Sequence, residues 1–100
     1  MMKFTNHLRR GGSLFVIITY DIGEKRITKV RKIIRKYLFW VQNSVFEGEI
    51  TEGKLQKCIN EIKKVIIEEE DSIFVYKIYG NGRFEKKIIG LEKSVNDEFI

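Results

Sequence analysis

A run of seven uncharged residues, "LFVIITY" at positions 14–20, constrains the fold of this chain more than any other feature. The run is rich in β-branched and aromatic residues, which is typical of a central strand that is covered on both faces. It ends at a single acid, Asp21, and a strongly basic segment follows directly. The position of a carboxylate between a buried strand and a positive segment therefore needs an explanation.

The segment after Asp21 changes to helical spacing. Over residues 24–38 the apolar residues form one stripe, made of Ile27, Val30, Ile33, Ile34 and Leu38. Most of the cations lie off that stripe, where solvent or phosphate can reach them: Lys25, Arg26, Lys29, Lys32, Arg35 and Lys36. This pattern predicts an amphipathic helix with a basic outer face.

The remaining segments predict three or four further strands and one more helix. Residues 38–51 indicate two short strands that are broken near Asn43 and Ser44. Thr51 is suited to cap a helix over about residues 52–69, and we expect the acidic cluster at 68–71 to end that helix and to face solvent. Residues 72–80 and 84–93 indicate two strands joined by the turn "GNGR".

This order of elements predicts an α+β fold in which two helices cover one face of a mostly antiparallel sheet. The arrangement is the ferredoxin-like βαββαβ sandwich, here with an extra C-terminal strand. We expect one domain over residues 13–93, a mobile N-terminal extension over 1–12 and a C-terminal tail over 94–100.

Composition excludes several classes of protein. No apolar run approaches the roughly 20 residues of a membrane span, so we expect no membrane association. The single cysteine, Cys58, excludes an internal disulfide and a multi-cysteine zinc site, fits a cytoplasmic location, and is expected to pack in the core. The one histidine, His7, precedes the predicted domain, which argues against a Ser-His-Asp or Cys-His catalyst.

The net charge of +5 is unevenly distributed. Residues 1–50 hold 10 Lys or Arg against 4 acids, whereas residues 51–100 hold 9 against 10. A basic half favours a polyanionic partner such as nucleic acid, although a solvated charged surface would give the same count. Phe39, Trp40 and Phe46 could stack on bases, but core or dimer-interface positions are the favoured interpretation for these rings.

Asp21 is the sharpest candidate for chemistry. Carboxylate oxygen suits Mg²⁺, which takes one or two carboxylates together with water and phosphate oxygens. The alternative is that Asp21 caps the helix that begins near Glu24. One acid makes a poor metal site, but a two-fold dimer axis near the strand end would place two copies of Asp21 against one ion.

Three motifs carry a resemblance to a known family. "YDI" at 20–22, "VQNSVFEGEIT" at 41–51 and "EEDSIFVYKI" at 69–78 together resemble the second CRISPR-associated core protein, the small partner of the CRISPR integrase. The resemblance implies a homodimer of ferredoxin-like subunits, with the aspartate of "YD", here Asp21, binding Mg²⁺ or Mn²⁺. It also implies that the strand after "GNGR" completes the sheet of the partner subunit.

Two functional hypotheses follow from the residues and the resemblance. In the first, the protein is a metal-dependent endonuclease, acting on RNA or on duplex DNA in spacer acquisition and antiviral defence. Asp21 and Tyr20 would then form the catalytic site. In the second, it is a non-catalytic DNA-binding scaffold that bridges integrase dimers. Under both, we expect the following cations to bind nucleic acid: Lys25, Arg26, Lys29, Arg31, Lys32 and Arg35. A third possibility, a small-molecule sensor, would require an effector-sized pocket.

Overall fold

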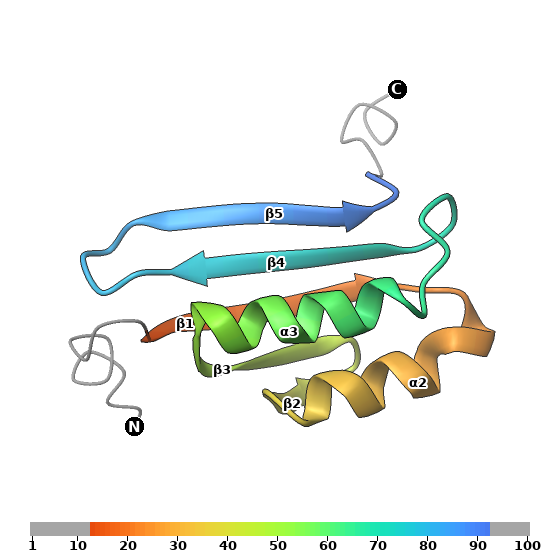
Figure 1. The fold of residues 1–100 in the computed structure, drawn as a ribbon, viewed down its shortest axis with the longest axis horizontal. Coiled ribbons are helices and arrows are strands. Elements are labelled where there is room, and N and C mark those ends of the chain that lie inside the picture. The colour runs from red at the N-terminus through yellow and green to blue at the C-terminus, as the bar shows by residue number, and fades with distance from the viewer. Residues whose placement is uncertain (1–12, 93–100) are drawn as a thin grey trace.

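The computed structural model describes residues 13–92, which form one five-stranded sheet with two helices on one face (Figure 1). The predictions for residues 1–12 and 94–100 lie outside these residues. In chain order the elements are β1 (Ser13–Asp21), α2 (Glu24–Arg35), β2 (Phe39–Gln42), β3 (Val45–Thr51), α3 (Glu52–Lys63), β4 (Ser72–Ile78) and β5 (Phe84–Gly90). The α+β fold with an extra C-terminal strand is therefore confirmed.

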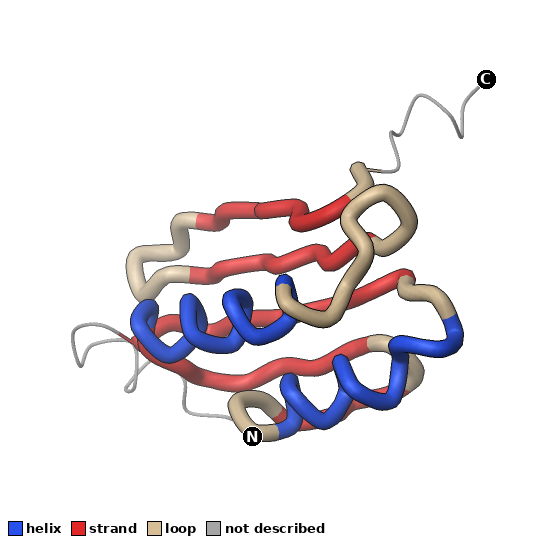
Figure 2. The backbone as a smooth tube through the Cα atoms, turned by 45° about the vertical axis from the view of Figure 1, so that its right-hand side comes forward, coloured by secondary structure: helices blue, strands red, loops and turns tan. Residues whose placement is uncertain are grey.

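The strand order is β2-β3-β1-β4-β5, and every neighbouring pair is antiparallel. The apolar run 14–20 thus becomes the central strand, as predicted, but within residues 13–92 helices cover only one of its two faces (Figure 2). Successive side chains of a strand point to opposite faces, so Val16 and Ile18, which are fully buried, lie under the helices, whereas Ile17, Thr19 and Asp21 lie on the other face. Figure 2 shows that both helices lie on the same side of the sheet and leave that other face open.

We call the uncovered side of the sheet the open face. Register neighbours across antiparallel strands share a face, so β1, β4 and β5 contribute the following residues: Phe15, Ile17, Thr19, Asp21, Phe74, Tyr76, Ile78, Phe84, Lys86 and Ile88. The rings of Tyr76 and Phe84 stack with centroids 6.0 Å apart, which agrees with this assignment. The open face is thus largely apolar over β1, β4 and β5, with Asp21 at one end, whereas β3 adds Val45 and two acids, Glu47 and Glu49, to the same face.

The core lies between the sheet and the helices. It includes Phe46 from β3 and Cys58 from α3, and both side chains are fully buried. The packing role predicted for Cys58 is confirmed, and burial raises the pKa of its thiol to about 12. Phe46 is a core residue, whereas Phe39 and Trp40, on the edge strand β2, are exposed; a place in a dimer interface stays a prediction for these two rings.

The second helix is shorter than the sequence predicts. Thr51 caps it as expected, since its hydroxyl oxygen accepts the N–H of Lys54 at 3.1 Å. The helix ends at Lys63 rather than near residue 69, because the N–H of Ile67 bonds to the carboxylate of Asp71 at 2.8 Å. Glu68, Glu69 and Glu70 are exposed, but the expectation that the whole acidic cluster faces solvent is wrong for Asp71, which has no exposed surface.

Strand β5 pairs with β4 of the same chain, from Ser72 opposite Gly90 to Ile78 opposite Phe84. Within residues 13–92 β5 is the edge strand, so its role in completing the sheet of a partner subunit, which the resemblance implies, stays a prediction. A tight turn explains the pairing, since the N–H of Tyr79 bonds to the carbonyl of Arg83 at 2.8 Å and directs β5 back along β4. Neither described helix is long and apolar enough to span a membrane.

Gly90 supplies the first testable prediction. Its φ is +89°, and a Cβ atom there would lie 2.2 Å from the backbone oxygen of Asp71. Gly90→Ala should therefore lower the free energy of unfolding by about 2 kcal/mol or more, measured by urea denaturation. Gly53→Ala is the matched control, because a Cβ there meets nothing within 4 Å and alanine favours the helix. Equal stability of the two variants would contradict this account.

Candidate metal and nucleic-acid site

Asp21 is the last residue of β1, and its side chain is exposed at the end of the open face. Its register partner is Ser72, the first residue of β4. The hydroxyl of Ser72 donates to the carbonyl oxygen of Leu91, and the N–H of Leu91 donates to the carbonyl oxygen of Asp71 at 2.7 Å. The end of the sheet that carries Asp21 is thus fixed by hydrogen bonds between the start of β4 and the segment after β5.

The structure assigns the start of α2 to residues other than Asp21. Gly23 is the N-cap, and no side-chain cap hydrogen bond is formed there. The N–H of Gly23 instead donates to the Oδ1 atom of Asp71 at 2.9 Å. The alternative interpretation, in which Asp21 serves only to cap this helix, is therefore not supported by the geometry of the helix start.

Asp71 is the residue that sequence reasoning missed. Its buried carboxylate receives two bonds from Arg26, from Nε to Oδ2 at 2.6 Å and from Nη2 to Oδ1 at 2.8 Å. These bonds to Arg26, together with the N–H groups of Ile67 and Gly23, hold the pKa of Asp71 well below its usual range. One signal was available, because Asp71 is the last acid of its cluster and directly precedes a buried strand.

Tyr20 does not lie with Asp21. It is the preceding residue of β1, so its side chain points to the helix-covered face, where it is only 8% exposed and packs 6.3 Å from the ring of Phe46. Burial raises the pKa of the Tyr20 hydroxyl, and the charges of Arg31 and Arg35 partly offset this shift. The two residues predicted to be catalytic therefore lie on opposite faces of the sheet, and of the two only Asp21 is exposed.

The six cations predicted to bind nucleic acid fall into two groups. Arg26 is held by Asp71 and by Glu70, whose Oε1 lies 3.1 Å from its Nη2 atom, so its guanidinium serves the structure. Among residues 13–92, none of the other five forms an ion pair: Lys25, Lys29, Arg31, Lys32 and Arg35. Arg31, Lys32 and Arg35 are brought together with Thr28 around a shallow pocket of about 210 Å³.

A single chain does not supply a complete metal site. Within residues 13–92, no group of three or more His, Cys, Asp or Glu side chains is placed to hold an ion. Asp21 alone offers one carboxylate, whereas Mg²⁺ accepts one or two carboxylates with water and phosphate oxygens completing its shell. Two Asp21 side chains from two subunits, together with a phosphodiester and water, would match that donor set.

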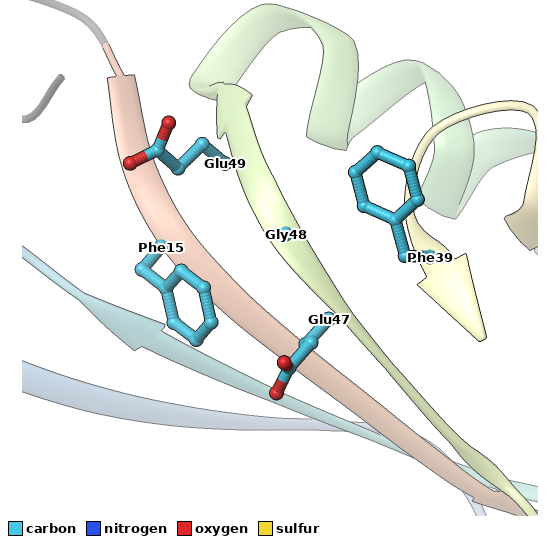
Figure 3. A pocket seen from close by; sticks show the side chains of 5 residues that line it. All are labelled: Phe15, Phe39, Glu47, Gly48 and Glu49. Atoms are coloured by element: carbon cyan, nitrogen blue, oxygen red, sulfur yellow. The ribbon is translucent and has the colours of Figure 1, made fainter. Parts of the chain in front are cut away.

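A second pocket, of about 370 Å³, lies on the side of the sheet away from the helices (Figure 3). Phe15, Phe39 and Gly48 line it together with two acids, Glu47 and Glu49. The acids make this region unsuited to phosphate. The pocket is a hollow at the end of the open face away from Asp21, where β3 contributes its two acids.

Comparison with known proteins gives a consistent result. A family model described as CRISPR associated protein Cas2 matches residues 14–86. A protein of Thermodesulfovibrio yellowstonii named CRISPR-associated endoribonuclease Cas2 3 is 51% identical over 86 residues, covering 86% of this chain and 98% of the relative. A CRISPR-associated endoribonuclease Cas2 of Methanocaldococcus jannaschii is 39% identical, covering 99% of this chain and 87% of the relative.

Solved structures agree with these sequence relatives. A crystal structure described as that of cas2 superposes with a TM-score of 0.64 at 35% identity, covering 82% of this chain and 92% of the other. The Streptococcus pyogenes Cas2 structure gives a TM-score of 0.55 at 29% identity, covering 84% and 93% of the two chains. The similarity therefore extends over most of both molecules in each comparison.

Proposed function

Because this chain belongs to the Cas2 family of CRISPR-associated proteins, we propose that it is an Mg²⁺-dependent endoribonuclease that acts as a homodimer. Its relatives from T. yellowstonii and M. jannaschii bear the name endoribonuclease. One observation carries the proposal: Asp21 is exposed at the end of a sheet face that is largely apolar over β1, β4 and β5. Burial of that face against a second copy would bring two Asp21 side chains to one boundary.

The open face supports dimerisation on physical grounds. Contiguous apolar surface of this kind is a mark of an interaction site in a soluble protein. A two-fold interface uses the same patch on both subunits, so each residue near the axis meets its own copy. Side chains of the partner would then fill the hollow beside Phe15, whereas the sensor hypothesis would place a small molecule in the same pocket of about 370 Å³.

Each group near the cleavage site has a distinct part. When bound, Mg²⁺ supplies Lewis-acid polarisation of the phosphodiester and lowers the pKa of its bound water. The two Asp21 carboxylates would hold the ion, while Mn²⁺, with the same preference for oxygen ligands, could replace it. Lys25, Lys29 and Lys32 would neutralise phosphates along the strand, so that affinity falls as salt rises.

The second candidate function is the scaffold. The exposed cations of α2 suit duplex DNA as well as RNA, and the family resemblance implies a CRISPR integrase as protein partner in spacer acquisition. In that case Asp21 would be dispensable and the dimer would bind without cutting. The cytoplasmic location indicated by the single cysteine stays a prediction under either function.

The dimer is tested by placing a charge on the open face. Wild-type protein should have the mass of a dimer, and Ile17→Glu should have the mass of a monomer. The reason is that the substitution would bury a carboxylate from each subunit in the proposed interface. Multi-angle light scattering measures the mass, and RNA cleavage should fall with it. Gln56→Glu, an exposed position on α3, is the control and should leave both unchanged. A dimeric and fully active Ile17→Glu protein, with circular dichroism of the wild type, would refute the proposed interface.

A further inference from the structure

We propose that Trp40 and Arg31 form a binding site for one unpaired nucleobase, beside a pocket that takes the adjoining phosphate. The inference rests on the proposed nucleic-acid function and adds the substrate class to it. It assigns a preference for single strands over duplexes to one side chain on the edge strand.

The indole ring of Trp40 is held in place while much of it remains accessible. Its Nε1 atom donates to the backbone oxygen of Asn43 at 2.9 Å, and Asn43 has a φ of 42° in the turn between β2 and β3. Trp40 stands opposite Phe46 in the strand register, next to the core. The side chain is nevertheless 48% exposed. A fixed and half-exposed ring can stack on a base with little loss of conformational freedom.

Positive charge lies directly beside this ring. The guanidinium carbon of Arg31 lies 5.8 Å from the centroid of Trp40, within the range of a cation–π interaction. The Nε atom of Arg31 has no hydrogen-bond partner within residues 13–92. Arg31 also lines the 210 Å³ pocket with Lys32 and Arg35, so one side chain joins the ring to the basic pocket. A phosphate in the pocket would place its own base near the ring.

Phe39 shows why exposure alone does not identify a base-stacking ring. It is 76% exposed, more than Trp40, and it is the preceding residue on the same strand. Phe39 lines the same pocket as Glu47 and Glu49 (Figure 3), whose carboxylates would repel a phosphodiester. Of these two exposed rings on β2, only Trp40 is both exposed and adjacent to cations of the basic pocket.

The chemistry of stacking gives the preference for single strands. In a duplex both faces of each base are already stacked, so a protein ring can stack only on a base that has left the helix. Phosphate contacts are common to single strands and duplexes and carry no such discrimination. A site that combines Trp40 with the pocket should therefore favour single-stranded RNA or DNA, whichever base occupies it.

The single tryptophan of the chain makes a direct test possible. Oligouridine added to the full chain in EDTA should quench the emission of Trp40. An abasic oligomer of equal length and charge, or a duplex, should leave the emission nearly unchanged. Equal effects of oligouridine and the abasic oligomer would show phosphate binding without stacking and would overturn the inference. An absence of quenching at saturating oligouridine, as expected if a protein partner covers this ring, would overturn it too.

Substitutions at Trp40 and Phe39 provide a second, independent test of the stacking site. Trp40→Leu should weaken oligouridine binding about 5- to 150-fold in fluorescence anisotropy, the range expected for one lost stacking contact. Trp40→Phe should restore most of the affinity, and Phe39→Leu, which removes a neighbouring exposed ring away from the basic pocket, is the matched control that should leave oligouridine affinity unchanged. The affinity for duplex should stay the same in all three variants. A loss shared equally by oligouridine and duplex would reject the stacking site.

The outcome is separable from that of the proposed nuclease function. Trp40→Leu should raise KM for RNA cleavage and leave kcat within a few-fold, since Asp21 remains in place. A protein that quenches normally but does not cut would reject the nuclease and retain the base site. A protein that cuts with unchanged KM after Trp40→Leu would retain the nuclease and reject the base site.

Discussion

Replacing Asp21 with asparagine should lower the rate of Mg²⁺-dependent RNA cleavage at least about 100-fold, because a bound metal ion lowers such barriers by several kcal/mol and asparagine removes the charged ligand. Binding of RNA should persist, since the exposed cations of α2 do not depend on Asp21. Cleavage of labelled RNA and of duplex DNA, measured beside anisotropy of the same probes, separates the two effects.

Glu24→Gln is the matched control for this experiment. Glu24 is an exposed acid three residues from Asp21, but it lies in the first turn of α2, where an acid suits the helix dipole. Its replacement should leave cleavage within about two-fold. Equal cutting by wild type and Asp21→Asn would mean that the activity arises elsewhere, and the scaffold function would then be favoured over the nuclease.

Asp71→Asn should be the most destabilising of the substitutions considered, lowering the free energy of unfolding by about 3–5 kcal/mol. Removing one charge of a buried pair leaves the other without compensation, and Asp71 has no exposed surface. The carboxylate also accepts the N–H groups of Gly23 and Ile67, which an amide oxygen satisfies less completely. Urea denaturation with circular dichroism measures the loss.

Glu70→Gln tests whether burial is the cause. Glu70 also contacts Arg26, at 3.1 Å, but its side chain is 63% exposed. Exposed pairs contribute little, so this variant should lose less than about 1 kcal/mol. Similar losses for Glu70→Gln and Asp71→Asn would contradict the distinction between the two acids.

The depressed pKa of Asp71 fixes the direction of its pH dependence. A carboxyl group whose pKa is lower in the folded state binds fewer protons there than in the unfolded chain. Its contribution to stability is therefore complete above the ordinary pKa of about 4 and declines as pH falls below that value. Unfolding measured from pH 7 to pH 3 should show a steeper loss for the wild type than for Asp71→Asn.

The fold could be predicted from local patterns because those patterns match the tertiary contacts. The run 14–20 is apolar on both faces, and the structure makes it the central strand with helices on one side and the largely apolar open face on the other. The cap at Thr51 could likewise be predicted, since the hydroxyl oxygen of a threonine at this position accepts the backbone N–H three residues later, here that of Lys54. The end of α3 could not be predicted from the sequence, because it depends on the hydrogen bond from the N–H of Ile67 to the carboxylate of Asp71 after the helix.

The candidate site was only partly predictable, because some of its features depend on contacts between distant parts of the chain. Position in the strand identified Asp21, but alternation along β1 also determines that Tyr20 points to the opposite face, which adjacency in the sequence obscured. The role of Arg26 depends on Asp71, 45 residues away in the chain. Helical spacing alone cannot distinguish a cation with a distant buried partner from one that stays in solvent.

The central claim is that two Asp21 side chains from different subunits share one ion. Isothermal titration of the dimer with Mn²⁺, in the presence of an uncleavable RNA analogue, measures the number of ions bound per chain. We predict one ion for every two chains, and loss of that binding in Asp21→Asn. One ion per chain, or unchanged binding in the variant, would contradict the shared site.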